Sequence, residues 1–362
     1  MENRIVVVGG GIAGAAACLR LVDAGLQPLW VAPNESGQRK HGEHLSPAAC
    51  TLLQEVGVLE LLDRPYHREA NVMYSAWGSD QLAERDSIVH LEGPGTVLDR
   101  EAFERDLAAE VGKRGVERRE VPLKEVHRNG KQWELTFDDE GAGEQMSADY
   151  LIDASGRHAV IAKGQAPRFR SDKLVAVIAY MEQRADSDVE PTRATLIEAV
   201  SDGWWYATLL ADQRLALNYY TDPDLLPEEI SRETEVIEHL LGQTHYISRW
   251  IDEAGFEFTS SPYLASAGTT WIAPAGGEGW VAVGDAAASF DPLSSHGMTA
   301  ALWTAITGAD AAIAYLSGDS GPSITYTQKV AAGIQDFLDK RTVIYGQETR
   351  FENSAFWMRR RP

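Results

Sequence analysis

The sequence predicts an α/β protein in which a parallel-sheet domain is interrupted by an antiparallel sheet and followed by a C-terminal helix. Two observations lead to this fold class. Residues 5–32 combine a short apolar strand, a glycine-rich turn, a helix and a second strand, which is the βαβ pattern typical of dinucleotide-binding domains. Residues 170–221 show one strand after another, separated by short turns, which is typical of an antiparallel meander. Strand and helix alternate again after residue 272, so one domain encloses the other.

The first elements are the clearest. Residues 5–8 are β-branched and suit a strand buried on both faces. Because a folded strand starts this early, we expect no signal peptide. We expect the last helix to pack on the protein and the arginines at 359–361 to be solvated. Further helices are expected at residues 47–62, 100–113, 227–241, 297–316 and 323–351, and further strands at 29–32, 72–77, 133–137, 150–153, 174–180, 194–199, 204–210, 214–220, 263–267 and 280–283.

Charge and cysteine content exclude several classes of function. The 362 residues carry 33 basic and 54 acidic side chains, a net charge of −21, which argues against nucleic acid and anionic lipid as partners. No run reaches the roughly 18 apolar residues of a membrane span. Cys18 and Cys50 form neither a disulfide framework nor a metal-ligand set. We therefore expect a cytoplasmic protein without a metal site.

The glycine-rich turn has the spacing of a nucleotide-binding loop. Residues 9–14 (GGGIAG) match G-x-G-x-x-G between a strand and a helix, the context that gives this motif its value. The glycines allow a tight turn, close approach of the backbone to a diphosphate and close helix packing, and the helix N-terminus favours the negative charge. Such turns also occur without a ligand, but the βαβ context favours nucleotide binding. The candidate cofactor-binding residues are Gly9, Gly11, Ile12, Ala13 and Gly14.

One expected feature of this loop is missing. An acidic residue that binds the ribose should end the second strand, about 20 residues further on. That strand ends in Ala32 and Pro33, and the nearest acid is Glu35. Either Glu35 reaches back or the contact is lost. We favour loss, which predicts weaker retention of the cofactor.

A second motif indicates which dinucleotide binds. In residues 280–298 a strand leads to Gly284-Asp285, a loop holds Asp291-Pro292, and Gly297 opens a helix. This segment resembles the Gly-Asp motif of flavin hydroxylases. The resemblance implies FAD, with Asp285 on the ribityl chain and the helix N-terminus at Gly297 and Met298 facing the flavin ring.

Two more segments resemble the same family. Residues 149–157 (DYLIDASGR) are similar to its middle motif, and residues 97–103 (VLDREAF) to the segment whose arginine contacts FAD, which nominates Arg100. A solvated charge at a helix start is the alternative for Arg100. The resemblance covers essentially the whole chain and implies the single-component flavin monooxygenase fold of aromatic hydroxylases and tryptophan halogenases. It implies a Rossmann-like FAD-binding domain (residues 1–64, 100–165 and 272–320), an antiparallel-sheet substrate domain (65–99 and 166–271) and a C-terminal helical segment (321–362).

The motifs also favour one branch of this family. Residues 42–47 (GEHLSP) look like the Gly-Glu-x-x-x-Pro stretch of halogenases, yet residues 69–74 lack the lysine that halogenases need. The halogenase Trp-x-Trp-x-Ile-Pro box is also absent from residues 203–209 (GWWYATL). The combination looks closest to flavoprotein maturases that hydroxylate a tryptophan in the precursor of a quinone-cofactor oxidase, which starts cysteine tryptophylquinone formation. A hydroxylase of a small or carrier-bound aromatic, a halogenase and a flavin-binding chaperone without turnover are the alternatives.

The family chemistry implies a short set of working residues. FAD supplies the redox chemistry, with NAD(P)H as a transient reductant and dioxygen as oxidant. Pro292 and His296 are expected on the oxygen side of the pocket; His296 and His44 could each move a proton or simply bond backbone. Trp204 and Tyr206 share one face of a strand and could flank the substrate or flavin, or only pack.

Overall fold

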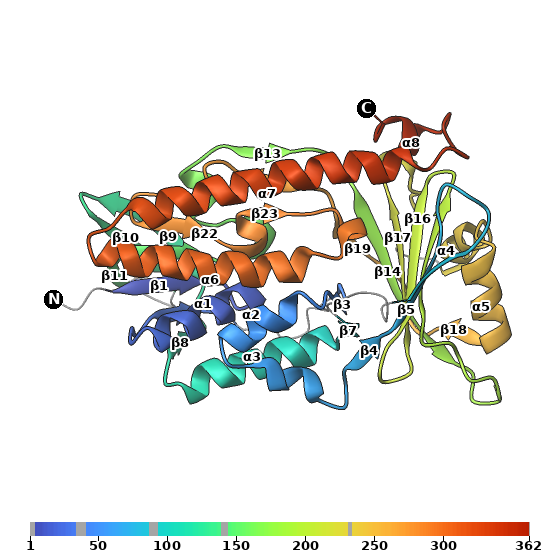
Figure 1. Ribbon diagram of the computed structural model, residues 1–362, viewed down its shortest axis with the longest axis horizontal. Coiled ribbons are helices and arrows are strands. Elements are labelled where there is room, and N and C mark those ends of the chain that lie inside the picture. Colours follow the sequence, from blue (N-terminus) through green and yellow to red (C-terminus); the bar gives the residue numbers. More distant parts are fainter. Residues whose placement is uncertain (1–3, 34–40, 87–92, 139–143, 231–233, 362) are drawn as a thin grey trace.

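The computed structural model describes residues 4–33, 41–86, 93–138, 144–230 and 234–361. Figure 1 shows two halves side by side, a helix-covered parallel sheet and a large antiparallel sheet, with a long C-terminal helix lying across both. The predicted fold class is confirmed. Among the helices of the described segments, none is both long and apolar enough to cross a membrane.

The first half is built on a six-stranded sheet. Its first strand pairs in parallel with the second strand and with the strand that ends at Asp153. All four residues of that first strand are buried, which explains its unbroken β-branched sequence. The strand order is β21 (Gly276–Gly277), β22 (Trp280–Ala282), β12 (Tyr150–Asp153), β1 (Ile5–Val8), β2 (Leu29–Val31) and β8 (Glu117–Arg119).

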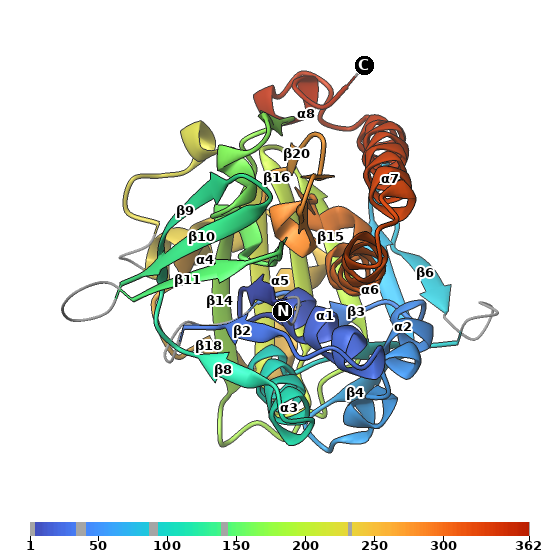
Figure 2. The ribbon, with the colours of Figure 1, turned by 90° about the vertical axis from the view of Figure 1, so that its left-hand side faces the viewer.

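Helices cover one face of this sheet and a small antiparallel sheet covers the other. Figure 2 shows the two layers on opposite sides of the strands. The small sheet inserts Trp133, whose indole Nε1 donates to the Gly279 carbonyl at 2.8 Å. The helices are α1 (Ile12–Asp23), α2 (Ala49–Glu55), α3 (Arg100–Lys113) and α6 (Gly297–Leu316), and the small sheet is β9 (Leu123–Asn129), β10 (Gln132–Phe137) and β11 (Gln145–Ala148).

The second half is an eight-stranded sheet whose pairs are antiparallel, except that β15 and β5 run parallel. One face packs its Trp205 and Leu217 against two helices, and the other face turns toward the first half. The strands are β18 (Phe256–Phe258), β14 (Val175–Gln183), β17 (Leu215–Thr221), β16 (Gly203–Leu209), β15 (Thr195–Val200), β5 (Val72–Ala76), β6 (Ala83–Asp86) and β19 (Tyr263–Ser266), and the helices are α4 (Thr234–Leu241) and α5 (Tyr246–Ala254).

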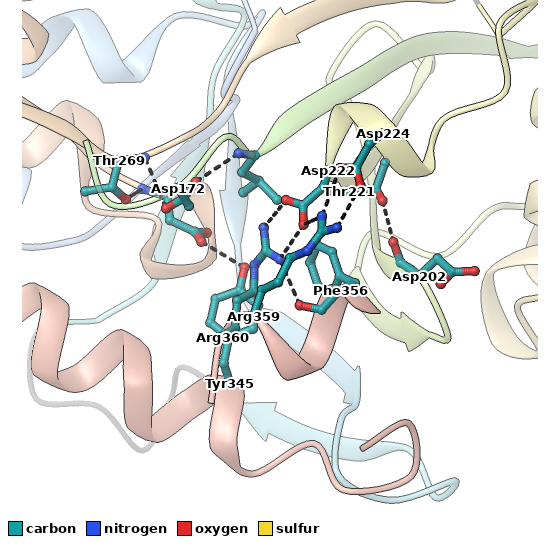
Figure 3. Close-up of polar contacts among 12 residues, drawn as sticks. Asp172, Asp202, Thr221, Asp222, Asp224, Thr269, Tyr345, Phe356, Arg359 and Arg360 are labelled. Atoms are coloured by element: carbon teal, nitrogen blue, oxygen red, sulfur yellow. Dashed lines mark hydrogen bonds and ion pairs between the residues drawn. The ribbon is translucent and has the colours of Figure 1, made fainter. Parts of the chain in front are cut away.

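The C-terminal segment ties the halves together. Helix α7 (Gly321–Gly346) lies along α6, and α8 (Ala355–Met358) lies at the ends of strands β15 and β17 of the large sheet. The expectation of a solvated arginine tail is wrong for Arg360. Figure 3 shows its guanidinium against Asp222, with a hydrogen bond of 2.5 Å, and Arg359 bonds the same carboxylate at 2.8 Å.

The structure differs from the predicted helices in two places. The helix expected at 47–62 is split, because the chain turns at Gly57, which has a φ of +67°. Helix α5 was not predicted. The remaining short elements are β3 (His44–Leu45), β4 (Arg68–Ala70), β7 (Gly95–Val97), β13 (Arg168–Arg170), β20 (Thr270–Ile272), β23 (Ala288–Ser289) and the single-turn helices Leu59–Asp63, Gly156–His158, Ala162–Gly164, Pro223–Leu225, Gly284–Ala286 and Pro292–Ser294.

Candidate functional site

A cavity of about 600 Å³ lies where the two halves meet, a size typical of small-molecule and cofactor sites. It joins the strand ends of the parallel sheet to one face of the antiparallel sheet. Gly14 and His296 are not among its lining residues, and Glu35 lies outside the described residues. The sequence-predicted residues that line it are Gly9, Gly11, Ile12, Ala13, His44, Arg100, Trp204, Tyr206, Asp285, Pro292, Gly297 and Met298.

Close packing in the glycine loop leaves no room for a side chain at two of its glycines. A Cβ on Gly9, whose φ is +128°, would lie 2.1 Å from the Ala154 carbonyl oxygen, and a Cβ on Gly14 would lie 2.0 Å from the Gly9 oxygen. Gly11 is different, because its Cβ would meet only Glu104 Oε2 at 3.9 Å and would fill the cavity. The N-cap residue of α1 is Gly11, which has no side chain to cap the helix, and the first turn of α1 holds no acid. This backbone cradle suits a phosphate group.

Asp285 and Arg157 bring two motifs together on the cavity wall. Arg157 Nε lies 3.6 Å from Asp285 Oδ2, and Arg157 also donates to the Gly268 carbonyl at 2.6 Å. Withdrawal from water raises the pKa of Asp285, and the charges of Arg157 and Arg100 only partly oppose this rise. The Asp285 carboxyl thus lines the cavity beside a guanidinium group, which suits the hydroxyls of a polyol chain.

Arg100 is not a solvated charge. It begins α3, where the Asp99 side chain caps the helix by accepting from Ala102 N at 2.9 Å. Its guanidinium bonds Glu104 Oε1 at 2.6 Å and the backbone carbonyls of His41 and Gly42 at 3.2 Å. Arg100 therefore positions the backbone before Glu43 beside the cavity.

At the end of β2, where a ribose-binding acid is expected, lies an arginine from the neighbouring strand β8. The guanidinium of Arg118 lies 5.3 Å from the ring centre of Trp30 and donates to the Ala32 carbonyl at 3.2 Å. Because Glu35 lies outside the described residues, the favoured loss of its contact with the ribose stays a prediction, and so does the alternative that Glu35 reaches back.

The Asp291–Pro292 loop is held from the C-terminal helix. The fully buried Asp291 Oδ2 accepts from Arg341 Nε at 3.0 Å and from the Tyr345 hydroxyl at 2.8 Å. Tyr345 in turn accepts from the Trp204 indole at 3.1 Å. This chain of contacts connects the loop to the large sheet, a link that local motifs do not encode.

The two candidate histidines differ in their surroundings. His296 is exposed at the N-terminus of α6, a helix without a side-chain cap. His44 lines the cavity, where burial, followed by the positive charges of Arg68 and His296, lowers its pKa to about 4. At neutral pH, His44 is therefore an uncharged imidazole, and its surroundings oppose the gain of a proton.

The sheet side of the cavity is aromatic. Trp204 stacks on Tyr220 with ring centres 4.0 Å apart, and Tyr206 lies beside them on the same face. Glu43 projects among these rings and accepts from the Tyr180 hydroxyl at 3.2 Å. No sequence motif nominates Asn218 or Tyr220 as a site residue. Glu43 is also absent from the predicted site residues, although its place in the GEHLSP segment is a usable signal.

Comparison with known proteins identifies the cofactor. Residues 2–204 match the family described as FAD binding domain. The chain belongs to the FAD-binding domain family. FAD is thus its cofactor, as predicted, and the chain is an FAD-dependent oxidoreductase. The residues present fit FAD: the Gly11 cradle and the uncapped α1 suit its diphosphate, and Asp285 offers a carboxyl to its polyol chain.

The relatives of this flavoprotein include halogenases and a hydroxylase. "Putative FAD-dependent oxidoreductase LodB" of Marinomonas mediterranea is 29% identical over 369 residues, covering 98% of this chain and 96% of its own. The solved structure of QhpG, a peptidyl tryptophan dihydroxylase essential for tryptophylquinone cofactor biogenesis, has a TM-score of 0.75 and 25% identity over 99% of this chain and 79% of its own. CmlS, a flavin-dependent halogenase, has a TM-score of 0.87 and 21% identity over 100% and 68%, which shows the shared fold.

Proposed function

We propose that this flavoprotein is a monooxygenase that uses NAD(P)H and dioxygen to hydroxylate a tryptophan in the precursor of a quinone-cofactor oxidase, as a step of cysteine tryptophylquinone maturation. The similarity to LodB along the whole chain and the dihydroxylase activity named for QhpG support this reading. The precursor protein is then its partner.

The observation that carries the proposal is the composition of the cavity wall. Its sheet side presents Trp204, Tyr206 and Tyr220, which suits a flat aromatic ring. No lysine stands among the described residues that line the cavity. Halogenases are expected to need such a lysine, so the residues that line the cavity favour hydroxylation over halogenation.

The chain's own residues would act by binding, orienting and excluding water. FAD, when bound, supplies the oxidation–reduction chemistry that activates dioxygen. The backbone of the glycine loop, the uncapped α1 and Asp285 would hold FAD, with Arg100 keeping the adjacent backbone in place. Pro292, Gly297 and Met298 would close the cavity near the flavin ring and limit its contact with water.

A proton leaves the ring when a hydroxyl group replaces its hydrogen. His44 is the one of the two predicted histidines that lines the cavity, but its pKa of about 4 makes it a weak base that would hold this proton only briefly. His296 is exposed at the helix start and would serve to pass a proton to solvent.

The test is an oxygen-transfer assay with the FAD-loaded protein, NADH or NADPH, and precursors encoded beside its gene. We expect a precursor to gain the mass of an oxygen atom on one tryptophan, and a precursor with phenylalanine at that position to gain none. Turnover on a free or carrier-bound aromatic with no gain on any precursor would instead assign a small-molecule hydroxylase. NAD(P)H oxidation at background would contradict both enzymatic readings and leave a flavin-binding chaperone.

A further inference from the structure

A buried carboxyl group in the cavity has an oxygen atom without a partner. Glu43 is only 3% exposed, and its Oε1 accepts from the Tyr180 hydroxyl. Within the described part of the chain, its Oε2 has no hydrogen-bond partner. Burying an unpaired carboxyl oxygen costs free energy. Such an atom in a cavity therefore indicates a ligand that donates a hydrogen bond to it.

The side chain of Glu43 faces the large sheet. Its backbone is anchored where its carbonyl accepts from Leu98 N at 2.7 Å, just before strand β3. Three tyrosines of the large sheet have raised pKa values, mainly because they are buried and next because Glu43 lies near them. They are Tyr180 of β14, Tyr206 of β16 and Tyr220 of β17. The carboxyl therefore projects toward the aromatic wall, where a substrate ring would lie.

Asn218 presents a second acceptor on the same wall. Strand pairing places it opposite Tyr206 on one side and Ile178 on the other. Asn218 is 2% exposed and lines the cavity, and its Oδ1 has no partner among the residues described. Two unpaired acceptors beside the Trp204–Tyr220 stack suit a flat apolar ring that carries a hydrogen-bond donor.

We propose that Glu43 and Asn218 bind the N–H group of an indole ring and so make the site specific for indole among aromatic rings. The inference deepens the proposed function and rests on its aromatic substrate. Indole matches the site because its only polar group is a donor, whereas the rest of the ring suits the stacked aromatic wall. Glu43 and Asn218 thereby orient the ring as well as select it.

The test compares indole with benzofuran, which has the same shape but an oxygen atom in place of the N–H group. Each is titrated into the FAD-loaded protein and followed by the change in flavin absorbance. A hydrogen bond to the buried carboxyl group predicts that indole binds about threefold to tenfold more tightly than benzofuran. Glu43→Leu should abolish this preference and Glu43→Gln should reduce it. The matched control Glu117→Gln, on the exposed edge strand β8, should retain it.

Three results would overturn the inference: equal binding of both rings to the unmodified protein, binding of neither, or an unchanged preference in Glu43→Leu. Retained FAD absorbance and thermal unfolding temperature show that the variants are folded. The oxygen-transfer assay on the precursor is scored separately. Indole preference without precursor modification leaves the inference standing and removes the maturase function, whereas precursor modification without indole preference does the reverse.

Discussion

The two walls of the cavity are built on opposite principles. The flavin wall consists mainly of backbone, with the glycine loop and two uncapped helix starts presenting N–H groups. The opposite wall, which we call the ring wall, consists of side chains from the large sheet, joined by Glu43. On the flavin wall, close packing leaves no room for a side chain at Gly9. On the ring wall, two acceptor atoms, Glu43 Oε2 and Asn218 Oδ1, have no hydrogen-bond partner among the described residues.

This difference predicts how each wall responds to substitution. Where the flavin wall is closely packed, as at Gly9, it tolerates no added atom, so changes there should damage folding and FAD binding together. Unpaired polar atoms contribute little to stability and are retained for a ligand, so changes on the ring wall should damage binding alone. Substitutions that separate these two outcomes test the comparison.

Gly9→Ala should have the largest effect. The added methyl group would collide with the Ala154 carbonyl at 2.1 Å, at a φ of +128° that alanine rarely adopts. We expect a loss of about 4 kcal/mol or more in the free energy of unfolding, together with loss of bound FAD. Urea unfolding and the flavin content of the purified protein measure the two effects.

Gly112→Ala is the matched control, since it adds the same methyl group in α3 with nothing within 4 Å. It should raise stability by roughly 0.5–1 kcal/mol and leave FAD content unchanged. Equal behaviour of the two alanine variants would contradict the steric account of the flavin wall.

Arg341→Met should have the next largest effect, because it removes the cation that is paired with the buried Asp291. Asp291 would stay buried without its cation, which costs about 3–4 kcal/mol. The exposed Lys340–Asp336 pair, one residue away, supplies the control: Lys340→Ala should change stability by less than about 0.5 kcal/mol. Chemical denaturation measures both, and a small loss in Arg341→Met would show that Tyr345 and Leu293 hold Asp291 without help.

The walls also differ in how far the sequence predicts them. The fold class and FAD are confirmed because their signals are contiguous: one strand, one turn and one helix carry the glycine motif. The FAD contacts assigned to Gly11 and Asp285 stay predictions, although both residues line one cavity. Glu43 and Asn218 lie 175 positions apart by their residue numbers and come to line one cavity only through the fold, so no local pattern could join them.

Helix α5 was missed for the same physical reason. Its first turn is capped from a distant strand, where the Glu198 carboxylate accepts from the backbone N–H groups of His245, Tyr246 and Ile247 at 2.6–3.0 Å. A cap supplied across 47 to 49 positions of sequence leaves no local start signal.

His44, between the walls, should make stability depend on pH. Its folded pKa of about 4 lies below the ordinary value of 6.5, so the unfolded chain takes up the proton first as pH falls. The free energy of unfolding should therefore fall by about 2–3 kcal/mol between pH of about 6.5 and 4 through this group. His44→Gln should flatten that part of the profile in urea titrations at several pH values. An unchanged profile would mean that the buried imidazole gains its proton without cost.

Glu43→Leu should have the smallest effect on stability and the sharpest contrast with a matched residue. Glu43 and Glu198 are both buried, at 3% and 5% exposure. Glu198 accepts three backbone hydrogen bonds, so Glu198→Leu should cost about 2–4 kcal/mol. Glu43 leaves Oε2 unpaired, so Glu43→Leu should change the free energy of unfolding by no more than about 1 kcal/mol, and that change should be stabilising. Thermal and urea unfolding of the two variants measure both changes in stability.

A loss of stability in Glu43→Leu as large as in Glu198→Leu would make Glu43 a structural residue and remove the distinction between the walls. A stable Glu43→Leu variant that no longer prefers indole would show that this carboxylate is kept for its ligand.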